Sequence, residues 1–242
     1  MDIRHRVEQG LGSAATLVGF AAVSYAGIAG AAWARYGRAV PPAAGEADPL
    51  LDVFMPKYEV AERHHVSVGA PAAATFESLM ELDLDDSPLI RAIFRGREIL
   101  LGADADKASR IRGLVALTKE LGWVVLADVP GHAIVMGAVT RPWEAHVVFR
   151  GIPPEEFATF NEPGYAKIVW NLRADAIDPT RSIARSETRA VATDASARRK
   201  FRWYWARFSA GIVLIREVSM QLVKKEAERR AQVVAQSGGN GG

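Results

Sequence analysis

The sequence of 242 residues contains no cysteine. This absence excludes disulfide bonds, thiol nucleophiles and thiolate metal ligands. The sequence also lacks the Gly-x-Ser-x-Gly motif of serine hydrolases and any His-x-x-x-His pair that would place two imidazoles beside one metal ion. The adjacent His64 and His65 do not replace that pair, because neighbouring residues of a strand point to opposite faces. We therefore expect no metal, no other cofactor and no catalytic residue marked by its spacing.

A strong charge of either sign is also missing, since the net charge is +2. A balance this close to neutrality gives no reason to expect a nucleic acid partner. The charge is uneven, however, with ten basic and three acidic residues between Arg198 and Arg230. Such a segment is either a solvated helix face or a surface that meets anionic lipid, and the sequence leaves both open.

One long stretch, residues 11–34, contains no charged residue. About 20 apolar residues cross a bilayer as a helix, and rings such as Trp33 and Tyr36 favour its interface. We expect residues 1–36 to form a single-pass membrane anchor of undetermined orientation. The alternative is a secretory signal that is cleaved near Ala34, so that the protein is exported. Small residues recur at every fourth position and would let two such helices approach in a homo- or hetero-oligomer: Ala22, Ala26 and Gly30.

Residues 37–57 are expected to be a linker. Pro41, Pro42 and Pro49 lack the backbone donor and disfavour helix in the residues before them. The soluble domain is then expected over residues 58–235, followed by a disordered tail at residues 236–242.

The soluble part reads as strand, helices, several strands and a long final helix. Alternating patterns predict strands at 58–68, 123–129, 132–140, 144–149, 165–174 and 180–194. Helical patterns or start signals predict helices near 71–80, 87–94, 105–121 and 153–160, and a last helix over 196–234. Consecutive strands with short turns favour an antiparallel sheet, and segregated helices favour the α+β class.

Charged residues occupy one face of the last predicted strand: Arg185, Glu187 and Arg189. A ladder of ion pairs across neighbouring strands is the expected role. The alternative is a guanidinium at the rim of a pocket that meets a ligand carboxylate.

Several segments carry a resemblance to known proteins: the strand with His64 and His65, Ala70–Phe76, Asn161–Leu172, Ser186–Arg189 and Phe201–Trp205. Together with the element order, they resemble bacterial members of the START-like, or SRPBCC, helix-grip superfamily of polyketide-cyclase and lipid-transfer type. The resemblance covers roughly residues 58–230. It implies a curved antiparallel sheet around a C-terminal helix, with a cavity for a lipid, steroid or polyketide-like molecule.

Candidate cavity residues come from two strands and the last helix. Glu62 and His64 share a strand face, where they would be either an acid/base couple in a dry pocket or ordinary polar residues. The helix is apolar all round between Phe208 and Ile215, which requires burial on more than one side. A glycine in a helix interior costs about 1 kcal/mol relative to alanine, so Gly211 indicates a close neighbour. The full candidate set is Glu62, His64, Trp170, Phe201, Tyr204, Trp205, Phe208, Gly211, Ile212 and Ile215.

The function expected from these features is membrane-tethered, non-catalytic binding of a hydrophobic small molecule such as a lipid, an isoprenoid or a polyketide-like compound. One alternative is an enzyme of the cyclase or dehydratase type that uses Glu62 and His64. Another is a structural subunit that assembles with a second membrane protein.

Overall fold

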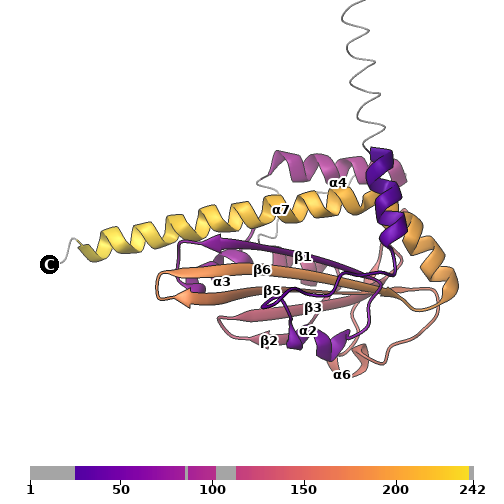
Figure 1. Cartoon of the computed structure of the whole chain (residues 1–242), viewed down its shortest axis with the longest axis horizontal. Coiled ribbons are helices and arrows are strands. Elements are labelled where there is room, and N and C mark those ends of the chain that lie inside the picture. Colours follow the sequence, from indigo (N-terminus) through magenta and orange to yellow (C-terminus); the bar gives the residue numbers. More distant parts are fainter. Residues whose placement is uncertain (1–24, 85–86, 102–112, 240–242) are drawn as a thin grey trace, which may run out of the picture.

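The computed structural model describes residues 25–84, 87–101 and 113–239, and a six-stranded antiparallel sheet forms its centre (Figure 1). The strand order is β1-β6-β5-β3-β2, and β4 pairs with β3. The strands are β1 (Val60–Val68), β2 (Val124–Val129), β3 (Ala133–Thr140), β4 (Phe149–Arg150), β5 (Ala166–Asp178) and β6 (Arg181–Ala192). The long helix α7 (Ala195–Gly239) lies across one face. The prediction of an α+β helix-grip fold is therefore confirmed.

The strands form because their side chains alternate between two apolar environments. In β5, Trp170 and Leu172 belong to a core that also contains Met220 and Val223 of α7. The preceding residue, Val169, belongs to a second core on the opposite face of the sheet. This period of two is the geometry of a pleated strand. The sheet is thus buried on both faces, and the face toward α7 is called the inner face below.

On the outer face the sheet is covered by two short helices, α2 (Pro49–Phe54) and α6 (Pro154–Phe157). Gly137 on β3 makes the close packing here possible. A Cβ atom at this position would lie 2.4 Å from Leu126 Cδ1 and 2.8 Å from Phe157 Cε2. The outer core is therefore dense where the fully buried Phe157 meets β3.

Helix α2 lies within residues 37–57, the range expected to be a linker. Pro49 occupies the first turn, where its missing N–H is not needed, and Asp48 caps the helix by accepting from the Leu50 and Leu51 amides. Leu51 is fully buried in the outer core. The packed part of the chain thus begins before residue 58, and the same proline that signals a break also starts a helix.

The remaining helices are α3 (Ala72–Met80), α4 (Pro88–Leu101) and α5 (Leu114–Glu120). Residues 102–112 lie outside the described residues, so the helix predicted near 105–121 is described only from residue 113 onward. The strand predicted at 144–149 is wrong, because only Phe149 and Arg150 pair with β3. The preceding residues form turns instead, with the Glu144 amide bonded to the Arg141 carbonyl and Thr140 Oγ1 donating to Val148 O.

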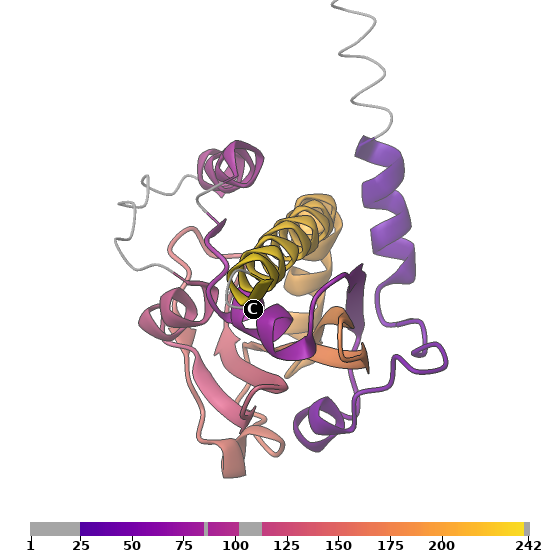
Figure 2. The ribbon, with the colours of Figure 1, turned by 90° about the vertical axis from the view of Figure 1, so that its left-hand side faces the viewer.

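Helix α7 is enclosed by more than the sheet. Viewed nearly along its axis, it lies between the sheet and α4, with the helix of residues 25–35 on a third side (Figure 2). The Tyr25 hydroxyl donates to the Arg207 carbonyl at 2.6 Å, and the position of a Cβ on Gly211 would lie 3.0 Å from Ile93 Cγ2. Residues 208–215 thus have neighbours on more than one side, but of these eight only Ser209 is buried, and Leu214 is 38% exposed, so the expected burial is partial.

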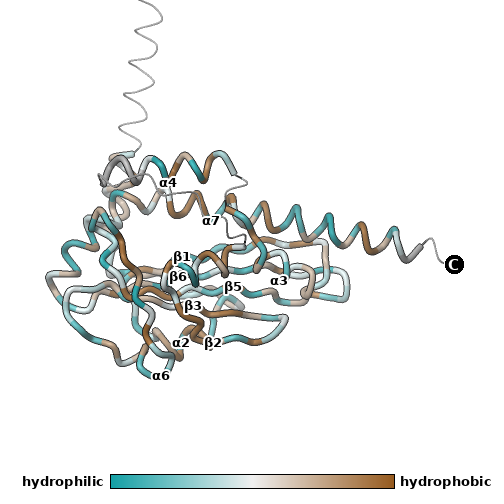
Figure 3. The backbone as a smooth tube through the Cα atoms, turned by 180° about the vertical axis from the view of Figure 1, so that it is seen from behind, coloured by the Kyte–Doolittle hydropathy of each residue, from teal (hydrophilic) through white to brown (hydrophobic). Residues whose placement is uncertain are grey.

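The far end of α7 runs past the sheet, with Val233 and Val234 exposed. Figure 3 shows that hydropathy along α7 changes from an apolar stretch beneath α4 to a mainly hydrophilic end. The helix continues to Gly239, beyond the predicted domain end at residue 235. Among the described residues, no helix is both long enough and apolar enough to cross a membrane. More than half of the predicted span, residues 11–24, lies outside the described part.

Candidate functional site

An open groove with a volume of about 740 Å³ runs between β1 and α7. We call it the β1–α7 groove. Its lining combines apolar residues of α7 with polar residues of both elements: Arg63, His64, His65, Leu214, Glu217, Val218, Met220, Gln221, Leu222 and Lys225. Of the ten candidate cavity residues, His64 is the one that lines this groove.

Five of the other candidates lie in or against two packed cores of the protein. Phe201 and Trp205 are buried in an aromatic core with Tyr36 and Val60, and Tyr204 and Ile212 pack against it. Trp170 is buried in the inner core, with its ring 6.2 Å from that of Trp123. These aromatic residues are packed against protein atoms, which is the core role of such a stripe.

The Phe208 ring lies tilted against that of Tyr204, with ring centroids 4.9 Å apart. The Ile215 carbonyl accepts a hydrogen bond from Ser219 Oγ at 2.7 Å. The close neighbour expected at Gly211 is Ile93 of α4, on the side of α7 away from the sheet. Gly211 therefore marks a helix–helix contact.

Glu62 and His64 do lie on the same inner face, opposite Thr188 and Ser186 of β6. Burial raises the pKa of Glu62, and the charges of Arg35 and Arg63 oppose that rise. Burial also lowers the pKa of His64, with a second contribution from Arg216 and an opposing one from Glu217. The carboxylate that acts on His64 is thus Glu217 of α7.

Arg216 is the inner-face residue that sequence reasoning missed. Its Nη1 atom lies 3.4 Å from Ser186 Oγ, and its guanidinium lies 5.7 Å from the centre of the Trp170 ring. Although the residue keeps some exposed surface, desolvation by burial lowers the pKa of Arg216 to about 10. The group still carries its charge at neutral pH. The signal was present in the sequence, because Arg216 follows Ile212 by four residues and so interrupts the apolar stripe.

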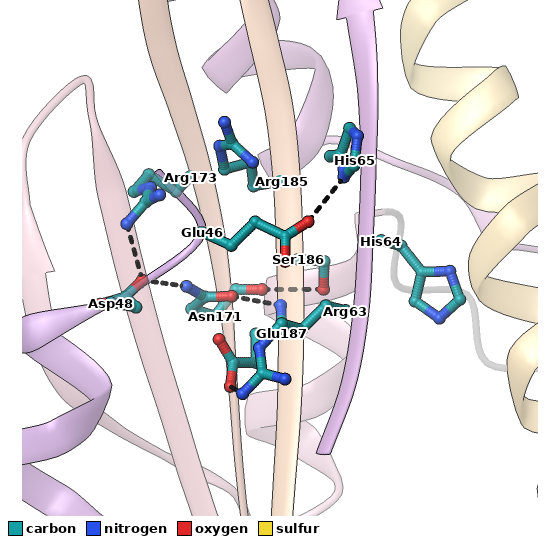
Figure 4. Close-up of a pocket in the computed structure, with 10 residues that line it drawn as sticks. All are labelled: Glu46, Asp48, Arg63, His64, His65, Asn171, Arg173, Arg185, Ser186 and Glu187. Atoms are coloured by element: carbon teal, nitrogen blue, oxygen red, sulfur yellow. Dashed lines mark hydrogen bonds and ion pairs between the residues drawn. The ribbon is translucent and has the colours of Figure 1, made fainter. Parts of the chain in front are cut away.

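A second polar region lies on the outer face, where α2 and the segment before it meet the sheet (Figure 4). Asn171 donates to Asp48 and accepts from the Glu187 amide, while Arg173 Nη1 lies 3.2 Å from Asp48 Oδ2. The pocket among these groups has a volume of about 20 Å³, which is room for about one water molecule. This region cannot hold an organic ligand, so we assign it a structural role. The His64 ring points away from it, toward α7.

The charge ladder predicted on the last strand is confirmed. Glu187 forms ion pairs with Arg63 of β1 at 2.9 Å and with Arg189 at 2.7 Å. Arg185 pairs with Asp175 of β5 at 2.7 Å. Within the described ranges, no group of three or more His, Asp or Glu residues is arranged to hold a metal ion.

No protein-family model and no curated protein matches this sequence. Solved structures do match at low similarity. A conserved protein from Geobacillus kaustophilus is 10% identical, with 70% of this chain and 95% of that chain covered and a TM-score of 0.30. The Zhui aromatase/cyclase from a Streptomyces strain is 14% identical, with 70% and 94% covered and a TM-score of 0.23.

Another match, Ara h 8.0201, is 11% identical, with 69% of this chain and 96% of that chain covered and a TM-score of 0.20. At these scores the matches add no detail about the site. The strand order, together with the position of α7 between the sheet and α4, is sufficient to define the fold class. The chain has a helix-grip fold with an open groove beside the gripped helix.

Proposed function

We propose that this chain is a membrane-tethered, non-catalytic protein that holds a hydrophobic small molecule in the β1–α7 groove. The observation that carries the proposal is the groove itself. Its volume of about 740 Å³ falls within the range of about 300–1,000 Å³ that is usual for small-molecule sites. Leu214, Val218 and Leu222 supply apolar lining, and His64 and Gln221 supply a few polar groups. That combination is typical of ligand-binding sites.

The test is to fill the groove without disturbing either core. Val218→Trp adds an indole to the groove, and Val233→Trp places the same group on the exposed end of α7 as a matched control. Organic extraction and mass spectrometry of the purified full-length chain should find an apolar molecule in the wild type and in the control, and much less in Val218→Trp. An empty wild-type protein that also fails to bind a fluorescent fatty acid would contradict the proposal.

The enzyme alternative requires Glu62 and His64 to act as a pair. Glu62 and His64 share a face, yet neither contributes to the pKa shift of the other. We expect Glu62→Gln and His64→Ala to leave the biological activity nearly intact. A working general base contributes about 10²–10⁴-fold, so a loss of that size with ligand content preserved would favour the enzyme.

Membrane tethering is supported by an aromatic and basic cluster at the start of α7. The Trp33 and Trp203 rings lie 4.4 Å apart, and the Arg202 guanidinium lies 4.1 Å above Trp33. Trp203 is 57% exposed, which is unusual for so large an apolar ring. Indole rings and arginine both favour the headgroup layer of a bilayer. The cluster would rest there if residues 11–34 hold the chain in the membrane.

Alkaline carbonate washing of membranes, combined with N-terminal sequencing, tests the tether. We expect the intact N-terminus in the washed pellet. A soluble product that begins at Arg35 would show that the segment is a cleaved signal. A chain that leaves the membrane only together with a second membrane protein would favour the assembly alternative.

A further inference from the structure

The inner face of α7 carries a positive charge, Arg216, that no carboxylate of the described residues neutralises. In the part of the chain that the structure describes, Arg216 has a serine hydroxyl and an aromatic ring as neighbours, and no carboxylate pairs with it. Arginines on the outer face, by contrast, have carboxylate partners. Arg63 and Arg189 both pair with Glu187, and Arg173 pairs with Asp48. A desolvated charge without a counter-ion is costly, so its presence requires a reason.

An unmatched polar atom lies close by. The Nε2 atom of His64 is buried and has no hydrogen-bond partner among the described residues, and it can donate in the tautomer that carries its proton there. His64 and Ser186 are directly opposite each other on β1 and β6, and Ser186 is the residue that Arg216 approaches. The Ser186 hydroxyl already donates to the Asn171 carbonyl, so its proton is not free. Arg216 therefore has one long hydrogen bond to a neutral hydroxyl and no carboxylate, and His64 Nε2 has no partner among the described residues.

The charged residues that line the β1–α7 groove have partners or balancing charges. Arg63 is paired with Glu187, and His65 lies 3.5 Å from Glu46. The carboxylate of Glu217 offsets the ammonium of Lys225 in net charge. Arg216 is not itself a lining residue, but it reaches Ser186, which lies opposite the lining residue His64, and it adds a positive charge with no carboxylate partner among the described residues.

We propose that the groove binds an amphiphile with one carboxylate at its head, and that Arg216 receives this carboxylate while His64 donates a second hydrogen bond. The inference rests on the function proposed above and names the chemical class of its ligand. A planar guanidinium matches a carboxylate with two parallel hydrogen bonds. The apolar tail would lie along Leu214, Val218 and Leu222.

The experiment compares one acid with its own ester. Full-length protein in phosphatidylcholine nanodiscs is titrated with the fluorescent cis-parinaric acid and with its methyl ester, and the signal of empty nanodiscs is subtracted. The wild type should bind the acid about tenfold to a hundredfold more tightly, the usual contribution of a charged hydrogen-bonded pair. Arg216→Met should remove this preference and change the ester affinity by less than about twofold. Arg216→Lys keeps the charge but loses the planar guanidinium, so this variant should keep part of the preference for the acid.

Arg199→Met is the matched control, since it removes an exposed arginine from the same helix. It should leave the preference unchanged. Equal binding of acid and ester by the wild type would overturn this inference and leave groove binding standing, whereas failure to bind either probe would overturn both. The melting temperature gives a second test: Arg216→Met should melt at or above the wild type without ligand, because a desolvated cation has been removed. A fall of several degrees would show that Arg216 is structural and would also overturn the inference.

Discussion

Arg189 is the residue whose replacement tests the outer-face account most directly. Its side chain is 1% exposed, and two of its three polar contacts join β6 to α2 and the residue that ends it. Nε lies 2.7 Å from Glu187 Oε1, and Nη1 lies 2.6 Å from Asp52 Oδ1 and 3.0 Å from the Met55 carbonyl. The guanidinium also lies 4.6 Å from the centre of the Tyr58 ring. Arg189→Met keeps most of the volume and removes all of these polar contacts.

The expected loss of unfolding free energy depends on which partners of Arg189 stay paired after the substitution. Breaking a buried ion pair by removing one partner costs about 3–5 kcal/mol. Glu187 would keep its pair with Arg63 at 2.9 Å, so we expect the lower end, about 3 kcal/mol. The Asp52 side chain is 54% exposed, and surface pairs contribute about 0–1 kcal/mol. Asp52→Asn should therefore cost less than about 1 kcal/mol.

The assay is denaturant unfolding of the full-length chain in detergent, with hydrogen exchange of α2 as a local readout. A loss of about 3 kcal/mol corresponds to a fall of about 6–12 °C in melting temperature for a domain of this size. The Met55 amide, which donates to the Leu51 carbonyl, should exchange faster because the end of α2 loses its anchor. Arg181, on the same strand as Arg189, forms an exposed pair with Asp178 of β5, and Arg181→Met should change stability by less than about 1 kcal/mol.

Two outcomes would refute this reasoning. If Arg189→Met costs less than about 1 kcal/mol, the buried network does not hold α2 to the sheet. If Asp52→Asn costs as much as Arg189→Met, the energy lies in the exposed pair rather than in the buried one.

Three further predictions concern single positions. Gly137→Ala should cost about 1–3 kcal/mol in unfolding free energy, because the new methyl group meets Leu126 and Phe157 at less than 3 Å, and a cost near zero would show that the outer core yields easily. Gly211→Leu should overpack the contact with Ile93 and lower stability by about 1–3 kcal/mol while ligand capacity stays constant, so reduced uptake at unchanged melting temperature would contradict its place against α4. Because burial raises the pKa of Glu62, the folded state holds that proton more tightly, and stability falls as pH rises through the folded pKa. Glu62→Gln should therefore be more stable than the wild type at pH 7, with a difference that closes below about pH 4, and a pH-independent difference would exclude this cause.

The sheet and its two faces could be predicted because alternation is a local signal. In β5, Ala166, Ile168 and Trp170 read as one face from the sequence alone, and the structure places that face toward α7. Helix α2 could not be predicted in the same way. It has six residues, too few to show a helical period, and its stability comes from burial of Leu51 and Phe54 against a strand far along the chain.

The groove was beyond sequence reasoning for a related reason. Aromatic residues on a helix stripe predict contact with the sheet but not whether the contact is filled. Phe201 and Trp205 meet the buried Tyr36 and Val60 and leave no room, whereas Leu214 and Val218 lie beside the edge strand β1, where the lining opens. The difference depends on which residues face each other across elements distant in sequence, and spacing within one element cannot supply it.

The two faces of the sheet also use arginine in opposite ways, and this contrast carries the functional argument. On the outer face, Arg189 is more deeply buried than Arg216, yet it has two carboxylates and a carbonyl as partners. On the inner face, Glu62 lies on the same strand as His64, but among the described residues it forms no ion pair with Arg216. A purely structural arginine would have been stabilised by moving one carboxylate within reach, as Glu187 is for Arg63. The missing carboxylate on the inner face is therefore best supplied by a ligand, which would stabilise the folded chain in proportion to its occupancy.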